Sequence, residues 1–365
     1  MGQPSIIISF QDAARMVVKR GQRGIIGMIV KDNAPRKNPC VITGASDIPS
    51  SLTAANQQLI NEARTGYLQP ATKIILYVVE PTTVGSTTTV DYTDARDYFA
   101  TIKLNWLIAP SAETDGKVSE LVTWVKNMRE KDIQIKAILP NASNPNCEGI
   151  VNFTTASAAG GGTTYTAETL CARVGGILAT TPLTGGQARS ATYAPIPELE
   201  SCETLTQTEM DEACDNGELI IFWDGEKCKL GRAVNSLKTT EKSDQWKKIR
   251  VVEIMDIIKD DIQKTAQDNF IGKYVASYDN KMLLIAAIKL YLTTLAKDNA
   301  IEEITDGDVD LDIDKIKDYL ANQGIDYTQM TDDEIRHANT GSHVYIKVYI
   351  SILDAIEDIE ISITI

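Results

Sequence analysis

The chain has 365 residues, 43% of them hydrophobic, and a formal net charge of −14. This length and apolar content allow a large buried core and predict two or three domains. The negative charge argues against a nucleic-acid-binding protein, because phosphate recognition requires a basic surface. We find no apolar run long enough to span a bilayer and no signal-peptide pattern, so we expect cytoplasmic folding and no membrane insertion.

Residues 1–22 are expected to form an extended N-terminal arm. Ile6, Ile8 and Phe10 share one face of an alternating segment, and a period of two is typical of a half-buried β-strand. The backbone of such a strand needs a neighbouring strand for its hydrogen bonds. The segment is therefore a candidate for pairing with another strand.

Residues 23–90 predict a small β-rich domain. Two apolar runs at residues 23–31 and 73–80 are expected to be strands, and the polar stretch 48–65 suits a short helix. The threonine-rich segment 81–89 is expected to mark a domain boundary.

Residues 91–235 predict a mainly parallel α/β domain, because expected strands alternate with expected helices. The helices are expected at residues 92–102, 116–131 and 167–179, and the strands at residues 105–109, 133–139 and 149–153. The glycine run 160–162 is interpreted as a surface loop. Asp224 and Gly225 predict the turn of a hairpin over residues 218–230.

Residues 236–352 predict an α+β domain in which helices cover one face of a small sheet. Apolar residues from Trp246 to Ala266 recur every three or four positions, and residues 281–295 are apolar nearly all round, which predicts two helices, the second buried. Thr331 and Glu334 fit a capping box that opens a short helix. We expect packing of the first two helices through Trp246, Ile249, Met255 and Ile262 on one side and Leu283, Leu284 and Ile288 on the other.

Residues 353–365 are expected to form a C-terminal arm ending in a strand. Ile359, Ile361, Ile363 and Ile365 share one face, and full burial of each would contribute about 1.5–3 kcal/mol. In one interpretation the alternating residues 343–352 form a hairpin with this strand, and the chain closes its own sheet. In the other, both terminal strands add to the sheet edges of further copies of the chain. The pattern leaves both interpretations open.

The sequence offers little that could support catalysis, a cofactor or a metal. His337 and His343 are the only histidines, and neither lies near a nucleophile motif. The glycine run lacks the spacing of a phosphate-binding loop, and the acidic segment 306–314 lacks the glycine and glutamate positions of an EF-hand. The six cysteines are scattered and are expected to be reduced, structural thiols. We therefore predict no enzyme, no cofactor and no metal site.

The charges are distributed unevenly. Residues 298–335 contain thirteen acidic residues and two lysines, whereas residues 15–37 contain seven basic residues and one aspartate. Asp308, Asp310 and Asp312 form a possible acidic contact patch toward a neighbouring subunit or another partner. The alternative interpretation is a solvated outer face.

Several segments resemble one known family. Residues 232–240, RAVNSLKTT, resemble the R-G-V-N-S-L-T-T segment of contractile-tail sheath proteins from myophages and phage-derived bacteriocins. The matching positions include Arg232, Val234, Asn235, Ser236 and Leu237. Residues 175–183 with 190–193, residues 248–256 and residues 354–358 are similar to further family segments, in the same order along the chain. Departures such as Ala233 in place of glycine affect loop details and not the resemblance.

The resemblance implies a structural subunit that polymerises as stacked hexameric rings around an inner tail tube. Contraction of this sheath would drive the tube through a target cell envelope. The implied partners are further copies of the chain, the inner tail tube protein, and baseplate and tail-terminator proteins. The implied location is a virion tail or a bacteriocin particle assembled in the host cytoplasm.

An alternative from another class is a small-molecule-binding protein or enzyme of α/β type with intramolecularly paired terminal strands. Such a protein would form a small defined oligomer and be stabilised by its ligand, whereas a sheath protein would form tubes.

Overall fold

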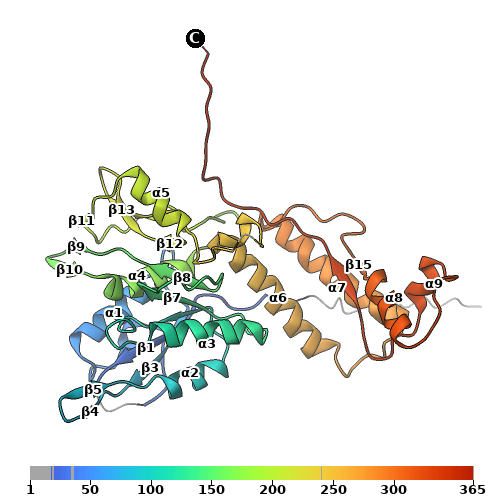
Figure 1. The fold of residues 1–365 in the computed structure, drawn as a ribbon, viewed down its shortest axis with the longest axis horizontal. Coiled ribbons are helices and arrows are strands. Elements are labelled where there is room, and N and C mark those ends of the chain that lie inside the picture. Colours follow the sequence, from blue (N-terminus) through green and yellow to red (C-terminus); the bar gives the residue numbers. More distant parts are fainter. Residues whose placement is uncertain (1–17, 19, 34–36, 240, 365) are drawn as a thin grey trace, which may run out of the picture. The chain divides into compact units, whose positions relative to one another are not determined.

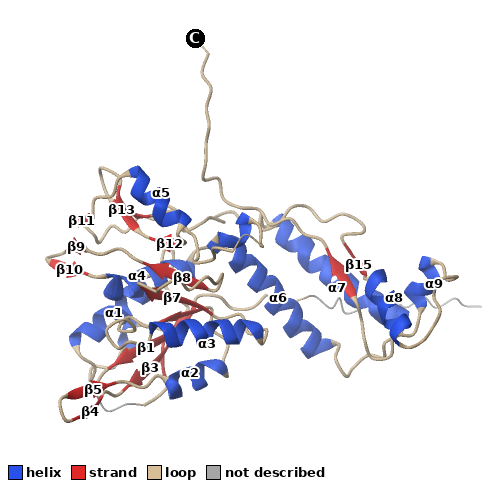
Figure 2. Cartoon of the chain, viewed as in Figure 1, coloured by secondary structure: helices blue, strands red, loops and turns tan. Residues whose placement is uncertain are grey.

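A computed structural model of the chain describes residues 18, 20–33, 37–239 and 241–364. The chain divides into two compact units. The α/β unit comprises residues 22–256 and 353–365, and the helical unit comprises residues 1–21 and 257–352. Their elements are shown in Figures 1 and 2.

The α/β unit is built on a seven-stranded sheet with the order β12-β8-β7-β6-β1-β3-β2. Its strands are β1 (Ile25–Lys31), β2 (Cys40–Ile42), β3 (Lys73–Val79), β6 (Trp106–Ile108), β7 (Lys136–Pro140), β8 (Ile150–Phe153) and β12 (Glu218–Leu219). All neighbours pair in parallel except β2, which runs antiparallel to β3. The central strands are continuously apolar, as expected for a parallel sheet covered on both faces.

Two helices cover each face of this sheet. Helices α1 (Ala54–Thr65) and α4 (Ala167–Thr180) pack on the face that carries Met28 and Ile108. Helices α2 (Thr93–Ala100) and α3 (Val118–Glu130) pack on the other face. Gly176 allows α4 to approach α1 closely, because a Cβ atom there would lie 2.3 Å from the carbonyl oxygen of Ala63.

The boundary predicted at residues 81–89 does not divide the sheet. Strands β1 and β3 lie in the same sheet as β6 and β7, so residues 23–90 are not a separate β-rich domain. Residues 81–89 form the short hairpin of β4 (Thr82–Val84) and β5 (Thr87–Thr89). The turn signal was correct, but a turn signal cannot distinguish a domain boundary from a surface hairpin.

Shorter elements complete the α/β unit. They are β9 (Ala158–Gly160), β10 (Thr163–Tyr165), β11 (Ser201–Cys202), β13 (Ile221–Trp223), β14 (Cys228–Leu230), α5 (Gln207–Asp215) and the 3₁₀ helices Ala45–Asp47 and Asp244–Lys247. The predicted hairpin is confirmed, since β13 pairs with β14 around Asp224 and Gly225. The glycine run 160–162 was predicted as a loop but lies at the tight turn between β9 and β10, where Gly161 and Gly162 have positive φ.

Helix α6 (Ile249–Asn269) begins in the α/β unit and ends in the helical unit. The helical unit continues with α7 (Tyr278–Lys297), β15 (Val309–Leu311), α8 (Ile313–Asn322), α9 (Asp332–His337) and β16 (Ile346–Val348). The predicted capping box is confirmed at Thr331 and Glu334.

Helix α7 is amphipathic, so the prediction of a buried helix is confirmed for one of its faces only. Leu292 is fully buried, but the side chain of Leu283 is 39% exposed. Ile249 was expected to pack against α7 but belongs to the core beneath the α/β sheet. Because leucines lie on both faces of α7, the sequence does not show which face is buried. Burial of a helix therefore cannot be inferred from its apolar content alone.

Candidate assembly site

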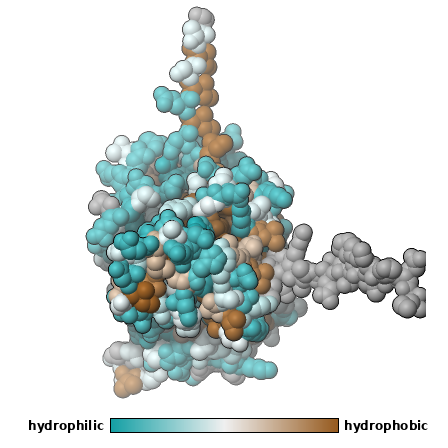
Figure 3. All heavy atoms as spheres, turned by 90° about the vertical axis from the view of Figure 1, so that its right-hand side faces the viewer, coloured by the Kyte–Doolittle hydropathy of each residue, from teal (hydrophilic) through white to brown (hydrophobic). Residues whose placement is uncertain are grey.

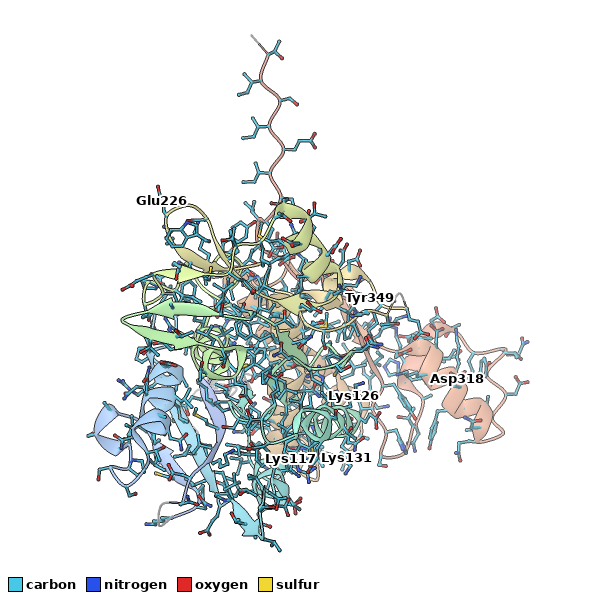
Figure 4. All side chains as sticks on the ribbon, turned by 60° about the vertical axis from the view of Figure 1, so that its left-hand side comes forward. Lys117, Lys126, Lys131, Glu226, Asp318 and Tyr349 are labelled. Carbon is cyan, nitrogen blue, oxygen red and sulfur yellow. The ribbon has the colours of Figure 1, made fainter. Side chains whose placement is uncertain are left out.

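The C-terminal arm ends in a segment that has no partner strand. Within residues 359–364, all of which the structure describes, no residue belongs to a helix or a sheet. Ile359, Ile361 and Ile363 are 73%, 75% and 82% exposed. The segment is extended (Figure 1), carries a strip of apolar side chains (Figure 3), and its side chains alternate between two sides (Figure 4).

The hairpin predicted between residues 343–352 and the final strand is wrong for the described residues. Strand β16 pairs with β15, with Lys347 opposite Asp310. Ile365, Ile6, Ile8 and Phe10 lie outside the described residues, so their predicted strand roles stay predictions.

The residues before the free strand, 353–358, are held by four side chains of the α/β unit. We call residues 353–358 the arm root, and Thr192, Arg232, Lys248 and Arg250 the seat. The seat contacts are distributed along the root.

Glu357 is the residue of the root with the most contacts. Its Oε1 accepts a hydrogen bond of 2.6 Å from the hydroxyl of Thr192. Its Oε2 pairs with Lys248 and lies 3.6 Å from Nε of Arg232. The Glu357 side chain is 5% exposed, so the charge is compensated at a nearly dry position.

Other contacts lie on either side of Glu357. Arg250 Nε donates to the carbonyl oxygen of Leu353 at 3.1 Å, and Lys248 lies 3.5 Å from Asp354. Arg232 pairs with Asp358, whose side chain is 79% exposed. Partial burial alone would lower the pKa of Arg232, but the hydrogen bond and charge of Asp358 raise it above its ordinary value.

In the family-like segment 232–240, residues 234–237 form a buried stretch, which we call the buried strap, whereas Arg232 is partly exposed. Val234, Asn235, Ser236 and Leu237 are buried. Ser236 Oγ donates to the carbonyl oxygen of Cys147 at 2.9 Å, and Asn235 Nδ2 donates to that of Trp246 at 2.8 Å. These hydrogen bonds connect the region before β8 to the start of α6, so the strap residues are structural, and Arg232 alone reaches the arm root.

The helical unit contains a two-stranded sheet that is small and open at its edge. Strand β16 pairs with β15, and no third strand joins them among the described residues. The backbone amide of Tyr349 donates to the carbonyl oxygen of Asp308, and the backbone amide of Asp312 donates to that of Tyr345. The backbone groups of these two tyrosines therefore point toward β15. Because backbone groups alternate along an antiparallel strand, the amides of Ile346 and Val348 face the other edge. Tyr349, labelled in Figure 4, is exposed just after this strand.

The possible acidic patch is largely engaged within its own unit. Asp310 forms a bidentate pair with Arg336, with distances of 2.7 and 2.5 Å. Asp312 is buried and caps α8 by accepting from the amide of Lys315. Asp308 accepts from the amide and hydroxyl of Thr305, both at 2.6 Å. A role for these three residues toward a partner stays a proposal.

The start of the described chain is also held by opposite charge. Arg20 pairs with Asp298 at 2.6 Å, and the amide of Gly21 donates to Asp261 Oδ1 at 2.8 Å. Val18 is buried in this region. Part of the basic N-terminal segment thus contacts the acidic part of its own helical unit.

The histidines and cysteines that could take part in catalysis or metal binding are engaged elsewhere or buried in the described part of the chain. His337 stacks on Tyr278 with ring centroids 3.9 Å apart, and His343 lies among tyrosines. No group of three or more histidine, cysteine or acidic side chains could hold a metal within the residues described. The six cysteines are free, and burial raises the pKa of each thiol, which makes them poor nucleophiles. Among the described helices, none has the length and apolarity to cross a membrane.

Comparison with known proteins gives two matching family models. The phage tail sheath protein central domain matches residues 85–236, and the phage tail sheath C-terminal domain matches residues 241–365. The tail sheath protein of Clostridium phage phiCD119 is 33% identical over 371 residues, covering 99% of both chains. The chain belongs to the phage tail sheath family. A further relative, the uncharacterized protein YqbK of Bacillus subtilis, is 25% identical over 62% of this chain and 49% of its own length.

Solved sheath structures share the fold of this family member. The sheath tail protein of Desulfitobacterium hafniense has a TM-score of 0.72 at 18% identity, covering 97% of this chain and 98% of that protein. The contracted sheath of the extracellular contractile injection system PVC has a TM-score of 0.66 at 14% identity, covering 100% and 98%. The contracted helical sheath of the anti-feeding prophage has a TM-score of 0.64 at 12% identity, covering 100% and 99%.

Family membership makes this sheath protein a structural subunit of a contractile tail of a phage or a contractile injection system. Sequence reasoning found the arm and Arg232 but missed Thr192, Lys248 and Arg250 as the seat. The available signal was charge complementarity between the bases at 248 and 250 and the acids at 354, 357 and 358. The sequence gives no indication that residues 248–250 and residues 354–358 lie in contact.

Proposed function

We propose that this sheath protein polymerises as stacked hexameric rings around an inner tail tube. The observation that carries the proposal is a free alternating strand in the same chain as an open sheet edge. The strand displays isoleucines on one face, and no further strand of the described residues pairs with the β16 edge at Ile346 and Val348. Donation of the arm to the β15–β16 sheet of a neighbouring subunit would complete both.

Burial energetics favour donation over leaving the strand in water. Each isoleucine that becomes fully buried contributes about 1.5–3 kcal/mol, and the strand also gains ladder hydrogen bonds. A two-stranded sheet is only marginally stable in water, so it gains from a third strand. Ile365 and the N-terminal strand with Ile6, Ile8 and Phe10 are proposed to act in the same way.

Contraction follows from such links. Flexible strand connections would keep subunits joined while their bodies rotate and form new contacts, so an extended lattice can be metastable. The energy stored in assembly would then drive the inner tube through a target envelope without a nucleotide. The proposed partners are the inner tail tube protein, baseplate and tail-terminator proteins. The proposed organisation keeps residues 1–22 and 353–365 as arms and residues 236–352 as the sheath core domain, assembled in the host cytoplasm.

The experiment places a charge on either face of the donated strand. Ile361→Asp with Ile363→Asp should give a folded, soluble subunit that forms no tubes by negative-stain microscopy. Ser362→Asp with Thr364→Asp adds the same charge to the polar face and should retain tubes. The proposal is wrong if the isoleucine variant forms normal tubes, or if it unfolds, because the strand would then belong to the core of its own subunit.

A further inference from the structure

The arm root is fixed to its own subunit largely through charged and polar groups. Ile356, in the middle of the root, is 86% exposed. The root is instead held by hydrogen bonds and ion pairs with the side chains of Thr192, Arg232, Lys248 and Arg250.

The seat residues are also held by contacts outside the arm root. Thr192 Oγ1 also accepts a hydrogen bond of 3.0 Å from the amide of Ala233. Arg250 donates to the carbonyl oxygens of Leu183 and Arg189, both at 3.1 Å. Lys248 is bridged to Val234 of the buried strap. Such supporting bonds hold the seat side chains in one geometry.

The contacts stop where the apolar alternation starts. Asp358 is the last residue that pairs with the seat, and Ile359 opens the exposed strand. The root therefore has a well-defined end, immediately before the segment that pairs elsewhere.

We propose that the seat and the arm root form a latch that stays closed in the assembled sheath, with Glu357 as its fixed point. Only residues from Ile359 onward are donated to the neighbour. This inference rests on the proposed function, because it assigns the boundary between the retained and the donated part of the arm. Lys248, Arg232 and Thr192 are then positioning residues for assembly.

The carboxylates of Glu357 and Asp358 have different tasks in the latch. The Glu357 side chain is nearly dry, so its pair with Lys248 resists screening by salt. The Asp358 side chain is exposed, so its pair with Arg232 opens readily and allows the strand to change direction. Subunits that rotate during contraction thus pull on Glu357 while the chain pivots at Asp358.

The start of the chain shows the same construction with the charges reversed. Arg20 and the amide of Gly21 are held by Asp298 and Asp261. Residues 20 and 21, at the end of the expected N-terminal arm, are thus also bound to their own chain by polar contacts, which is an independent observation in favour of arms that stay attached at their base.

The test is a zero-length carbodiimide cross-link between Lys248 and Glu357. Subunits labelled with ¹⁴N and ¹⁵N are mixed, assembled into tubes and cross-linked, and the peptides are analysed by mass spectrometry. The latch predicts that this link joins peptides of the same isotope only, in the isolated subunit and in tubes alike. Mixed-isotope links, or loss of the link on assembly, would overturn the latch.

Amino-acid substitutions test the latch without cross-linking. Glu357→Gln should lower tube yield about tenfold while the isolated subunit stays folded by circular dichroism, and Glu357→Asp, which keeps the negative charge, should retain more of the yield than Glu357→Gln. Asp358→Asn should change the yield by about twofold at most, as expected for an exposed pair, and Glu360→Gln serves as a matched control in the donated segment. A Glu357→Gln subunit that assembles like the wild type contradicts the latch.

Failure of the latch and failure of strand donation give different results. If donation is wrong, the isoleucine variant assembles normally whatever the cross-link pattern. If only the latch is wrong, that variant still fails to assemble, while Lys248 and Glu357 link between isotopes or fail to link.

Discussion

The seven-stranded sheet of the α/β unit and the β15–β16 sheet of the helical unit differ in how they are completed. The seven-stranded sheet of the α/β unit is covered on both faces, and Ile26, Leu107 and Ile138 in its strands are fully buried. The two-stranded sheet of the helical unit has half-buried Ile346 and Val348 and a free edge in the described structure. The larger sheet is completed within the chain, and the smaller one is the sheet that we propose a neighbouring subunit completes. A subunit can thus fold independently and still carry an open sheet edge for the proposed assembly.

The charged side chains of the two units also differ, because those of the α/β unit include a buried, paired network. In the α/β unit, Asp256 accepts two hydrogen bonds of 3.0 Å from Arg129 and one of 2.9 Å from Lys136. Lys136 also lies 3.2 Å from Glu253, which pairs with Arg23. In the helical unit the acidic run is carried mostly on the surface. Buried, paired charges hold the first unit together, whereas most acidic side chains of the run in the second are exposed, and their role toward partners is a proposal.

The largest effect is expected from breaking the buried network. Asp256→Ala would leave Arg129 and Lys136 without their shared carboxylate, and loss of one partner of a buried pair costs about 3–5 kcal/mol. Denaturant unfolding of the isolated subunit measures this cost. Asp318→Ala, on the exposed side of α8 (Figure 4), is the control and should change stability by about 0.5 kcal/mol at most. A small loss for Asp256→Ala would show that surface and buried charges do not differ in this way.

The next effect concerns cavities in the helical unit. Leu292 is fully buried on α7, so Leu292→Ala should cost about 2–5 kcal/mol. Leu283→Ala, on the exposed face of the same helix, is the matched control and should cost below about 1 kcal/mol. Leu284 is partly exposed and should fall between them. Thermal and chemical unfolding check the order, and equal losses at Leu283 and Leu292 would contradict an amphipathic α7.

The sequence predicted local elements better than their assembly. Helices at residues 116–131 and 167–179 and strands at 105–109 and 149–153 are confirmed within a few residues, because periodicity and caps are local signals. The separate domain at 23–90 was wrong, because strand order is a long-range property that Thr82–Val84 does not reveal.

The candidate site divides in the same way. The free strand was visible because Ile359, Ile361 and Ile363 alternate, but the choice between self-closure and a free end depended on which strand β16 pairs with. The seat could not be predicted, because it joins Thr192 and Lys248 to Glu357 across more than a hundred residues. The acidic patch was visible only as composition, and the structure shows that Asp310 and Asp312 are already occupied.

A moderate effect is expected on the pH dependence of the stability of the α/β unit. Burial alone would raise the pKa of Asp256, but the charges and hydrogen bonds of Lys136 and Arg129 lower it below the ordinary aspartate value. A lowered folded-state pKa means that the stabilisation is present above the unfolded value of about 3.9 and is lost as pH falls through the folded one. Stability measured from pH 6 downward should therefore fall more steeply in wild type than in Asp256→Asn. Parallel curves would show that this carboxyl does not contribute to acid unfolding.

The smallest effect is expected from the acidic surface of the helical unit, and it tests whether that surface is available to partners. Asp308, Asp310 and Asp312 are poor sites for charge reversal, because Asp310 pairs with Arg336 and Asp312 caps α8, so reversal would disturb folding. Glu303→Lys with Asp318→Lys changes exposed positions of the same run instead. Each exposed pair contributes about 0–1 kcal/mol, so stability should stay unchanged while the rate of tube assembly falls a few-fold in low salt. At about 1 M salt the Debye length is roughly 3 Å, and wild type and variant should then assemble at the same rate. If neither salt nor charge reversal changes the assembly rate, the acidic run is a solvated face. In that case the charges of the two units would differ only in that those of the buried network are paired within the chain.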